Sequence, residues 1–347
     1  MMPSAFSGPG YRITEDADLT RRNSFRVPAR TQWLIEVDDA ATLPEVFGFD
    51  AIRRAPQLIL GEGSNLLFTR DWPGAVLAMT ARGIRVLDDR DDLARVRVEA
   101  GENWNDFMHW SLGRGFAGLE NLILIPGSTG AAPIQNIGAY GVEVCEFIAA
   151  VEAFDRRGGQ LVRLDNTGCA FAYRDSIFKR EPDRYLVCAV EFLLPRQREL
   201  RVDYAGVREE LAAMKIGTPS HAAIADAVMR LRTRKLPNPA EIGNAGSFFK
   251  NPVVAANHAD ALLREHPHMP VWPAPDGQRK LSAAWLVEIC GFKGFREGDA
   301  GVSDRHALVL VNHGSATGAQ IWTLAEKIIA AVQARFCVRL EPEPRIV

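Results

Sequence analysis

The stretch NLILIPGSTGAAPIQNIGAYGVEV, residues 121–144, decides how the rest of this sequence is interpreted. An apolar run leads into a segment of small residues that contains Gly127, Gly130, Gly138 and Gly141. Glycine lets the backbone approach a ligand closely, and successive backbone N–H groups can bind a diphosphate. A turn-rich segment of this length is unusual in a compact domain unless it has a function. It therefore predicts a cofactor-binding loop, with a long structural loop as the alternative.

The segments on either side of this loop mix strand and helix patterns without a regular βαβ order. Alternating or continuous apolar runs predict strands at 33–37, 57–60, 94–101, 185–194 and 307–312. The glycine pair in RRGG predicts a hairpin that joins 149–155 to 160–164. Helical spacing of apolar residues predicts helices at 102–112, 221–235, 281–291 and 320–336. This irregular order favours an α+β fold.

Composition and charge exclude several classes of protein. The chain has 347 residues and a formal net charge of −2, which gives no support for a nucleic-acid or membrane-surface partner. No apolar run approaches the roughly 20 residues of a membrane span, and the N-terminus lacks the order of a signal peptide. The five cysteines are scattered and form no CxxC pair. We therefore expect a cytoplasmic protein with reduced thiols, no disulfide and no bound metal.

Two further glycine-containing stretches stand out. In LGEGSNLLF (60–68), the third glycine of a GxGxxG pattern is replaced by Leu66 and no phosphate-loop lysine follows. By itself this stretch is typical of an ordinary turn. In GNAGSFFKNP (243–252), Ser247 precedes two phenylalanines and has no base beside it in the sequence. In isolation this serine is typical of a turn hydroxyl.

The motifs taken together, in order along the chain, are more specific than any one of them. GEGSN, PGSTGAAPIQNIGAYG, YRDSIFK (173–179), GNAGSFFKNP and LEPEPR (340–345) resemble the UDP-N-acetylenolpyruvoylglucosamine reductase family. The resemblance runs from about Asn23 to the C-terminus. It implies a flavoenzyme that makes UDP-N-acetylmuramate for peptidoglycan, with non-covalent FAD, NADPH as reductant and a UDP-sugar enolpyruvate as substrate. A monomer is expected.

The resemblance also implies a fold of the vanillyl-alcohol-oxidase-like type, with two FAD-binding subdomains and a C-terminal α+β substrate domain. The expected parts are 1–75 with 338–347 returning to the active site, 76–236, and 237–337. The residues that match the family's motifs fall into three sets. The catalytic set is Arg174, Ser247 and Glu343. The FAD-binding set is Gly61, Glu62, Gly63, Ser64, Asn65, Pro126, Gly127, Ser128, Thr129, Gly130, Gln135, Asn136, Gly138, Ala139, Tyr140 and Gly141. The substrate-binding set is Tyr173, Tyr204, Lys235, Asn251 and His306.

Two positions depart from the family pattern. The motif usually written Asn-Thr-Phe is Asn23-Ser24-Phe25, and His306 stands where some members carry glutamine.

The implied chemistry explains why a serine without a base can act. Hydride addition to the vinyl carbon leaves negative charge beside the substrate carboxylate, which a bidentate, permanently charged arginine can stabilise. Glu343 would orient or polarise that carboxylate. Ser247 would give a proton rather than attack, with its alkoxide held by neighbouring donors such as Lys250.

Two other functions fit parts of the pattern. One is an FAD-dependent oxidase of alcohols, although no clear attachment histidine for covalent flavin lies at the glycine-rich loops. The other is a cofactor-free module that binds a nucleotide sugar. The module predicts a colourless purified protein, whereas either flavoenzyme predicts a yellow one.

Overall fold

The computed structural model describes residues 5–204 and 206–347, which form two compact units. The first unit consists of the described residues up to Ala17 together with Thr31–Glu62 and Trp72–Arg232. The second consists of Asp18–Arg30, Gly63–Asp71 and Thr233–Val347. Within the described ranges, no helix is long and apolar enough to cross a membrane. The three-part domain division expected from the resemblance stays a prediction.

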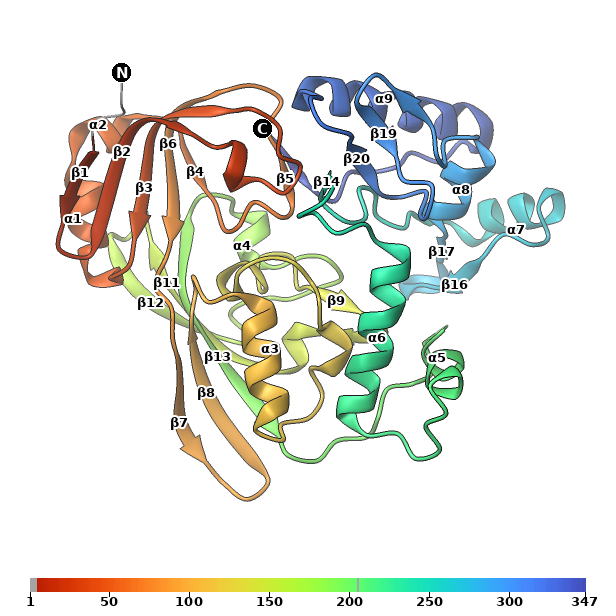
Figure 1. The fold of residues 1–347 in the computed structure, drawn as a ribbon, viewed down its shortest axis with the longest axis horizontal. Coiled ribbons are helices and arrows are strands. Elements are labelled where there is room, and N and C mark those ends of the chain that lie inside the picture. Colours follow the sequence, from red (N-terminus) through yellow and green to blue (C-terminus); the bar gives the residue numbers. More distant parts are fainter. Residues whose placement is uncertain (1–4, 205) are drawn as a thin grey trace. The chain divides into compact units, whose positions relative to one another are not determined.

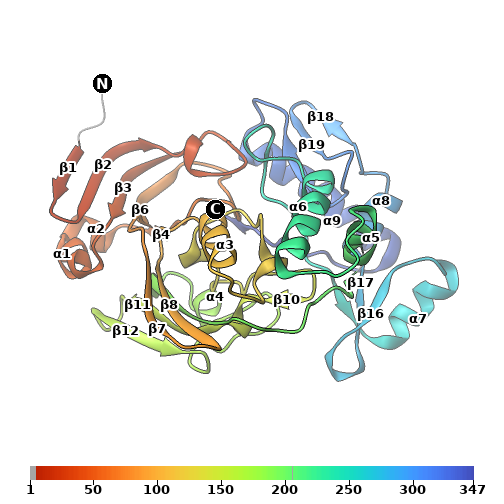
Figure 2. The same cartoon turned by 60° about the horizontal axis from the view of Figure 1, so that its bottom comes forward.

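A five-stranded sheet opens the first unit (Figure 1). Its strands, in spatial order, are β1 (Ala5–Gly8), β2 (Tyr11–Asp18), β3 (Arg30–Val37), β6 (Trp72–Met79) and β4 (Gln57–Ile59). The last three run parallel, as expected for strands joined by crossover segments. The short helices α1 (Leu43–Gly48) and α2 (Asp50–Arg54) provide that crossover and lie beside the sheet (Figure 2). Their residues Leu43, Val46 and Ile52 are buried in one core with sheet residues.

A second five-stranded sheet, wholly antiparallel, completes the scaffold of the first unit. Its order is β12 (Gln160–Asp165), β11 (Ile148–Asp155), β13 (Tyr185–Pro195), β8 (Leu93–Glu99) and β7 (Ile84–Asp89). On β8, Ala94, Val96 and Val98 are fully buried while the alternate residues are charged. Apolar and charged residues therefore alternate in ARVRVEAG because one face of this sheet is buried and the other carries the charged side chains.

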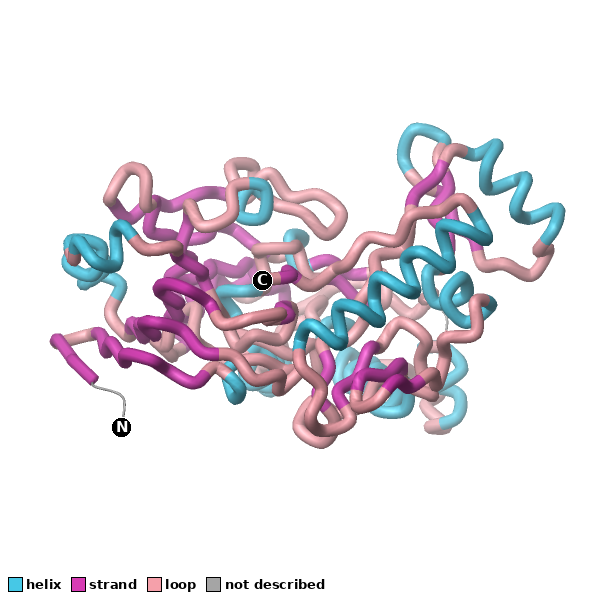
Figure 3. Tube along the Cα trace, turned by 90° about the horizontal axis from the view of Figure 1, so that it is seen from above, coloured by secondary structure: helices cyan, strands magenta, loops and turns pink. Residues whose placement is uncertain are grey.

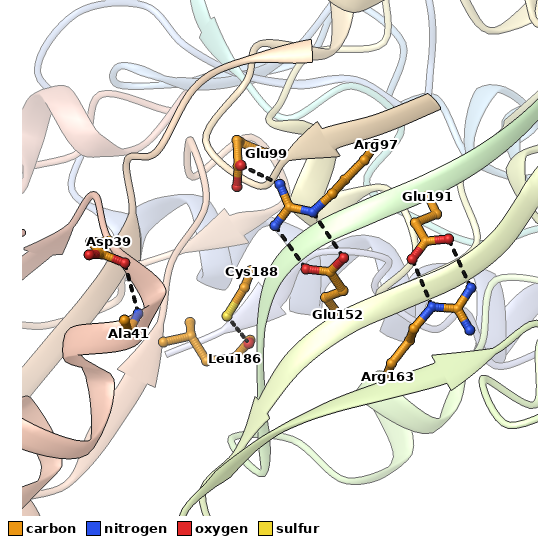
Figure 4. A network of polar contacts seen from close by, with 9 residues as sticks. All are labelled: Asp39, Ala41, Arg97, Glu99, Glu152, Arg163, Leu186, Cys188 and Glu191. Atoms are coloured by element: carbon orange, nitrogen blue, oxygen red, sulfur yellow. Dashed lines mark hydrogen bonds and ion pairs between the residues drawn. The ribbon is translucent and has the colours of Figure 1, made fainter. Parts of the chain in front are cut away.

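Ion pairs fix the charged face of this sheet across its strands (Figure 4). Arg97 Nε and Nη2 donate to the two carboxylate oxygens of Glu152 at 2.9 and 2.8 Å. Arg163 makes the same bidentate contact with Glu191 at 2.7 and 2.8 Å, and this hydrogen bonding lowers the pKa of Glu191. Because each pair joins side chains of different strands, a register slip would break it.

Helices and loops cover the apolar face of the second sheet. α3 (Trp104–Gly113) buries Trp104, Phe107 and Met108, and α6 (His221–Lys235) buries Ile224, Val228 and Leu231 in the same core. The shorter helices are α4 (Ile177–Arg180) and α5 (Val207–Ala213), and the small strands are β9 (Gly138–Ala139) and β10 (Val142–Glu143). Much of the remaining chain is loop, which Figure 3 shows in pink.

The second unit is built on the long helix α9 (Gly318–Phe336), which buries Ile321, Leu324, Ile328, Val332 and Phe336. Beside it are β14 (Gly243–Asn244), β20 (Leu310–Asn312), β19 (Ala300–Val302) and β18 (Arg296–Glu297), which form one sheet. A smaller sheet contains β15 (Val253–Val254), β17 (Arg279–Leu281) and β16 (Val271–Pro273). α7 (Ala256–Glu265), α8 (Ala283–Ile289) and the parallel pair β5 (Leu66–Leu67) and β21 (Arg345–Ile346) complete the unit.

The elements expected from the sequence are present, with ends that are shorter by one or two residues in several of them and the largest shortening in the strand expected at 307–312. The strand expected at 307–312 is limited to β20, and the helix expected at 281–291 to α8. Helix α8 begins later because Ser282 caps it, its hydroxyl accepting the Trp285 N–H at 3.2 Å. It ends before Gly291, whose φ of +82° is incompatible with a continuing helix. The described cysteines are all free.

Candidate active site

The glycine-rich loop is fixed to the second sheet of the first unit by its own backbone. The hydrogen bonds run from Trp104 N–H to Gly127 O at 2.9 Å, from Thr129 N–H to Glu102 O at 2.8 Å, and from Gly130 N–H to Ala100 O at 2.9 Å. Asn103 caps α3 at the same place, its side-chain oxygen accepting the Asn105 N–H at 2.9 Å. The PGSTG turn is therefore held by backbone hydrogen bonds against the β8–α3 connection.

Packing within the unit explains part of the glycine pattern of this loop. A Cβ on Gly130 would lie 2.5 Å from that of Ala100, and one on Gly61 would lie 3.0 Å from Ser128 Oγ. Gly127 and Gly141 have positive φ values of 132° and 81°. These glycines are needed by the fold itself, whatever ligand the loop binds.

The loop also contains a buried polar atom that the chain does not satisfy. Thr129 Oγ1 is buried and has no hydrogen-bond partner among the described residues. A buried hydroxyl without a partner costs free energy unless a ligand or a water molecule bonds to it. Together with the rigid turn of small residues, it fits the diphosphate-containing FAD expected at this loop. Of the other residues expected to bind FAD here, Gln135, Ala139 and Tyr140 are half-buried and Pro126 is exposed.

Arg174 is bound to the same loop. Its Nη2 donates to Gly138 O at 2.6 Å, and its Nη1 lies 3.5 Å from Asn136 O. The backbone at Arg174 is left-handed, with φ of +53°, and Lys179 Nζ donates to its carbonyl at 2.9 Å. Asp175, next to it in sequence, pairs instead with Arg180. The loop carbonyls therefore orient the guanidinium.

Two buried asparagines hold the loop in place. Asn136 donates to Ala172 O at 3.0 Å and to Glu143 Oε2 at 2.9 Å, so its amide joins the loop to the segment before Arg174. Asn121 donates to Tyr140 O at 2.9 Å and to Arg201 O at 3.0 Å. The side chain of Asn136, expected to contact the cofactor, is thus used within the chain. Asn121 was not expected from the sequence; its place in the motif NLILIPG offered no sign of this role.

In the second unit, Ser247 follows β14 in an extended segment. The Phe248 N–H donates to Leu308 O at 2.8 Å, and the Glu343 N–H donates to Phe248 O at 2.8 Å. Phe248 is fully buried and Phe249 is 1% exposed, and Phe248 packs edge-on against Phe25 with ring centroids 6.1 Å apart. The two aromatic residues therefore fix the segment, while Ser247 stays half-buried.

The C-terminal segment containing Glu343 is held against the same residues. Phe249 and Pro342 form an isolated antiparallel bridge, and the Lys250 N–H donates to Glu341 O at 3.0 Å. β21 then pairs with β5, so Glu343 does not lie in a frayed tail. Lys250 Nζ lies 3.1 Å from Glu341 Oε2, so its charge has a carboxylate partner. The structure thus brings Ser247 and Glu343 onto neighbouring extended segments.

The GEGSN turn divides between the two units. In the first unit, Glu62 Oε1 accepts a hydrogen bond from Asn103 Nδ2 at 3.0 Å. In the second, Gly63 has a φ of +67°, and its carbonyl accepts the Ser24 N–H at 3.1 Å. Asn65 Nδ2 donates to Glu343 O at 3.3 Å, so this asparagine holds the C-terminal segment. Ser64 is half-buried.

The residues expected to bind the substrate lie in both units. In the first, Tyr173 and Tyr204 are 48% and 54% exposed, and the Tyr204 ring is edge-on to that of Tyr140 at 5.5 Å. In the second, Asn251 Oδ1 accepts the N–H of Ala283 at 3.0 Å, so this amide caps α8.

His306 lies near Lys235 in the second unit. Burial, followed by the charges of Lys235 and Lys293, lowers the pKa of His306. Its Nδ1 accepts the Leu308 N–H at 3.3 Å, which leaves Nε2 as the nitrogen that bears the proton in the neutral ring. A neutral His306 can therefore donate one hydrogen bond, as the glutamine at this position in other family members can.

Comparison with known proteins agrees with this arrangement. A family model described as the C-terminal domain of UDP-N-acetylenolpyruvoylglucosamine reductase matches residues 238–347, and one described as an FAD binding domain matches residues 31–165. The chain is 53% identical over 339 residues to the UDP-N-acetylenolpyruvoylglucosamine reductase of Xanthomonas euvesicatoria pv. vesicatoria, covering 97% of each chain. It is 49% identical over 347 residues to the enzyme of the same name from Xylella fastidiosa, covering 100% of this chain and 99% of the relative.

A solved structure gives the same fold. The crystal structure of UDP-N-acetylenolpyruvylglucosamine reductase from Thermus caldophilus matches with a TM-score of 0.66, covering 100% of this chain and 99% of the other at 21% identity. The α+β fold class, with an FAD-binding part and a separate C-terminal part, is therefore confirmed.

Proposed function

Because the chain belongs to the UDP-N-acetylenolpyruvoylglucosamine reductase family, we propose that it reduces UDP-N-acetylglucosamine enolpyruvate to UDP-N-acetylmuramate for peptidoglycan synthesis. Near-complete coverage of relatives with about half of the residues identical supports this substrate. The match to an FAD binding domain supports an FAD-dependent oxidoreductase over a cofactor-free binding module. We further propose that the enzyme uses NADPH and works as a cytoplasmic monomer.

The residues proposed to hold FAD are those of the two glycine-containing turns. Gly61 and Ser128 bring these turns together within the first unit, and the Thr129 hydroxyl is a buried group without a partner among the described residues. FAD held there would supply the redox chemistry of hydride transfer between NADPH and the vinyl carbon of the substrate. The turns contribute binding and a fixed backbone.

Arg174 is proposed to stabilise the negative charge that develops beside the substrate carboxylate. Its guanidinium is permanently charged, and Gly138 O orients it through a 2.6 Å hydrogen bond. A preorganised donor of this kind stabilises developing charge without the cost of reorganisation during the reaction.

Ser247 is proposed to protonate the carbon that bears this charge, with Glu343 polarising the carboxylate. The observation that supports this pairing is the 2.8 Å hydrogen bond from the Glu343 N–H to Phe248 O, which places the two residues on neighbouring segments. Ser247 has the rigid support that a proton donor needs, because both following phenylalanines are buried. Lys250, paired with Glu341, remains close in sequence as a source of positive charge.

The test is a stopped-flow measurement under anaerobic conditions that separates the two half-reactions. Ser247→Ala should retain FAD and be reduced by NADPH at a normal rate, because neither step uses the hydroxyl. Reoxidation by the enolpyruvyl substrate should slow by at least the ~10²–10⁴ typical of a lost general acid. Ser247→Cys should recover part of that rate.

The matched control is Ser315→Ala, an exposed serine of the second unit. Both of its half-reactions should remain normal. If Ser247→Ala slowed reduction and reoxidation equally, Ser247 would have a structural role. If it slowed neither, the proposed proton transfer would be wrong.

A further inference from the structure

Asn244 is a buried amide close to the proposed proton donor, and none of the residue sets above includes it. It lies in β14, three residues before Ser247, and is 1% exposed. Its Nδ2 donates to Pro237 O at 3.1 Å and to Ile242 O at 2.8 Å, and its Oδ1 accepts the Gly246 N–H at 3.0 Å. Because the amide nitrogen faces two carbonyls and the amide oxygen faces an N–H, these contacts define the orientation of the amide.

The backbone of Asn244 is itself fixed within the second unit. Its N–H donates to Ser24 O at 3.0 Å, and it lies opposite Val311 where β14 pairs with β20 (Figure 1). Pro237, whose carbonyl accepts one of the side-chain hydrogen bonds, belongs to the same unit. The backbone and the amide of Asn244 are therefore both held, so this residue can hold the turn that follows it.

The turn after Asn244 has a conformation that benefits from such support. Gly246 has a φ of +69°, and a Cβ there would meet nothing within 4 Å, so the backbone conformation and not the available space requires this glycine. The hydrogen bond from the Gly246 N–H joins residues two apart, which is the Asx turn, in which an asparagine side chain acts as the acceptor. Because glycine has more conformational freedom than any other residue, the chain before Ser247 would be less restrained without Asn244.

Ser247 lies between this turn and a second fixed point. On its C-terminal side, the Phe248 N–H donates to Leu308 O and the Phe248 carbonyl accepts the Glu343 N–H, both at 2.8 Å. On its N-terminal side, the residue next to it is held by the side chain of Asn244. Misplacing a catalytic group by about 1 Å can cost ~10²-fold in rate, so the position of the hydroxyl depends on both fixed points.

We propose that Asn244 is a positioning residue for Ser247. It fixes the turn at Gly246 and thereby the position of the Ser247 hydroxyl, and it acts through the chain without contact with the substrate. The proposal rests on the proposed function for the role of Ser247. Its test has two parts, one that follows the reaction and one that follows the turn, so the two proposals can fail separately.

The first part measures both half-reactions by anaerobic stopped flow for the full-length holoenzyme carrying Asn244→Ala, Ser247→Ala or both substitutions. Asn244→Ala should slow reoxidation by the enolpyruvyl substrate about tenfold or more. Reduction by NADPH should stay normal, because it does not use the Ser247 hydroxyl. In the Ser247→Ala background, the same substitution should change reoxidation by less than about twofold, since no hydroxyl is left to misplace. Asn244→Asp, which keeps an acceptor for the Gly246 N–H, should recover part of the rate.

The second part follows amide hydrogen exchange without substrate, by mass spectrometry of peptides that cover residues 243–248. Asn244→Ala should speed exchange of the Gly246 amide, which loses its acceptor, by about tenfold or more. Protection of α9 should stay as in the parent, which would show that the unit remains folded.

Two further variants complete the test. Gly246→Ala keeps the Asn244 side chain but disfavours the positive φ, so it should also slow reoxidation and leave reduction normal. It tests the turn even if Asn244→Ala does not fold, because its Cβ has open space. The matched control is Asn238→Ala, which removes an exposed Asx turn of the same unit, where Asn238 Oδ1 accepts the Ala240 N–H at 3.0 Å. This control should change neither half-reaction nor the exchange of Gly246.

Three results would overturn the proposal. Equal slowing of reoxidation by Asn244→Ala with and without the Ser247 hydroxyl would show that the two residues act independently. Equal slowing of reduction and reoxidation would show a general structural role. Unchanged exchange at Gly246 would show that Asn244 does not hold the turn. Normal reoxidation by Ser247→Ala alone would instead refute the proposed proton transfer, while faster exchange at Gly246 would still show that Asn244 fixes the turn before Ser247.

Discussion

Replacing Gly138 by alanine should displace Arg174 without unfolding the protein. An added Cβ would lie 2.8 Å from Arg174 Nη1, whereas ordinary contact begins near 3.4 Å, so the guanidinium must retreat by about 0.6 Å. The backbone at Gly138 has no positive φ, so alanine can adopt it. The other close atoms, Val142 O at 3.0 Å and Glu143 Cγ at 3.1 Å, need shifts of a few tenths of an ångström.

The cost in stability should be small because the closest atom is the end of a flexible side chain. Alanine also gains about 0.4–1 kcal/mol by restricting the unfolded chain, which offsets part of the steric cost. We therefore expect the free energy of unfolding to change by less than about 1 kcal/mol. The catalytic cost should be larger, since misplacing a catalytic group by about 1 Å can cost ~10²-fold in rate. A shift of about 0.6 Å should slow reoxidation of the reduced flavin about tenfold, or 1.4 kcal/mol.

Urea unfolding and anaerobic stopped flow measure the two effects separately. Gly113→Ala is the matched control, because a Cβ there meets nothing within 4 Å and the backbone has no positive φ. This control should leave both half-reactions normal. Normal reoxidation by Gly138→Ala would refute the reasoning, because it would show that the position of the Arg174 guanidinium on this loop does not limit the reaction.

The remaining predictions concern stability and are measured by urea unfolding. Trp104→Ala should cost about 3–5 kcal/mol, since the side chain is 1% exposed and its Nε1 donates to a buried carbonyl at 2.9 Å. His221→Leu should cost about 3 kcal/mol, because the buried Glu120 carboxylate loses the ring 2.7 Å from its Oε1 and keeps the Gly118 N–H at Oε2; adding Glu120→Leu should recover part of the loss. Hydrogen bonding to Arg184 lowers the pKa of Asp155 to about 2. The ionised carboxylate therefore stabilises the fold by about 2 kcal/mol above about pH 4, and this stabilisation is lost as the pH falls through about 2. Asp155→Asn should remove that part of the acid dependence.

The fold could be predicted where one periodicity dominates a segment. The strand β8 follows from alternating residues, and α9 from Ile321, Leu324 and Ile328 at helical spacing. The pairing of β21 with β5 could not be predicted, because two-residue strands have no periodicity and the contact joins residues far apart in the chain. The same holds for the division into two units, in which 18–30 and 63–71 join the C-terminal part.

The residues of the candidate site were predicted from sequence motifs. Such motifs identify residues but do not predict the contacts that those residues make. Placing Glu343 at the site required the resemblance, because a residue near the end of a chain is ordinarily frayed. The structure supplies the missing reason, a hydrogen bond from its N–H to Phe248 O. For Asn136 and Asn65, the structure shows contacts other than the ones that the motifs predict. Both belong to the predicted FAD-binding motifs, yet their side chains hydrogen-bond within the chain. Their assignment as cofactor contacts stays a prediction.

The glycines of these motifs show why sequence alone cannot separate binding from folding. A Cβ on Gly63 would lie 2.0 Å from Arg22 O and one on Gly130 would lie 2.5 Å from that of Ala100, so both glycines are required before any ligand is considered. A glycine-rich loop therefore looks the same in sequence whether its glycines admit a diphosphate or allow two segments to pack. What distinguishes the two is a polar group that the fold leaves without a partner. By that criterion Thr129, inside the motif, is the residue at which ligand binding should be tested first.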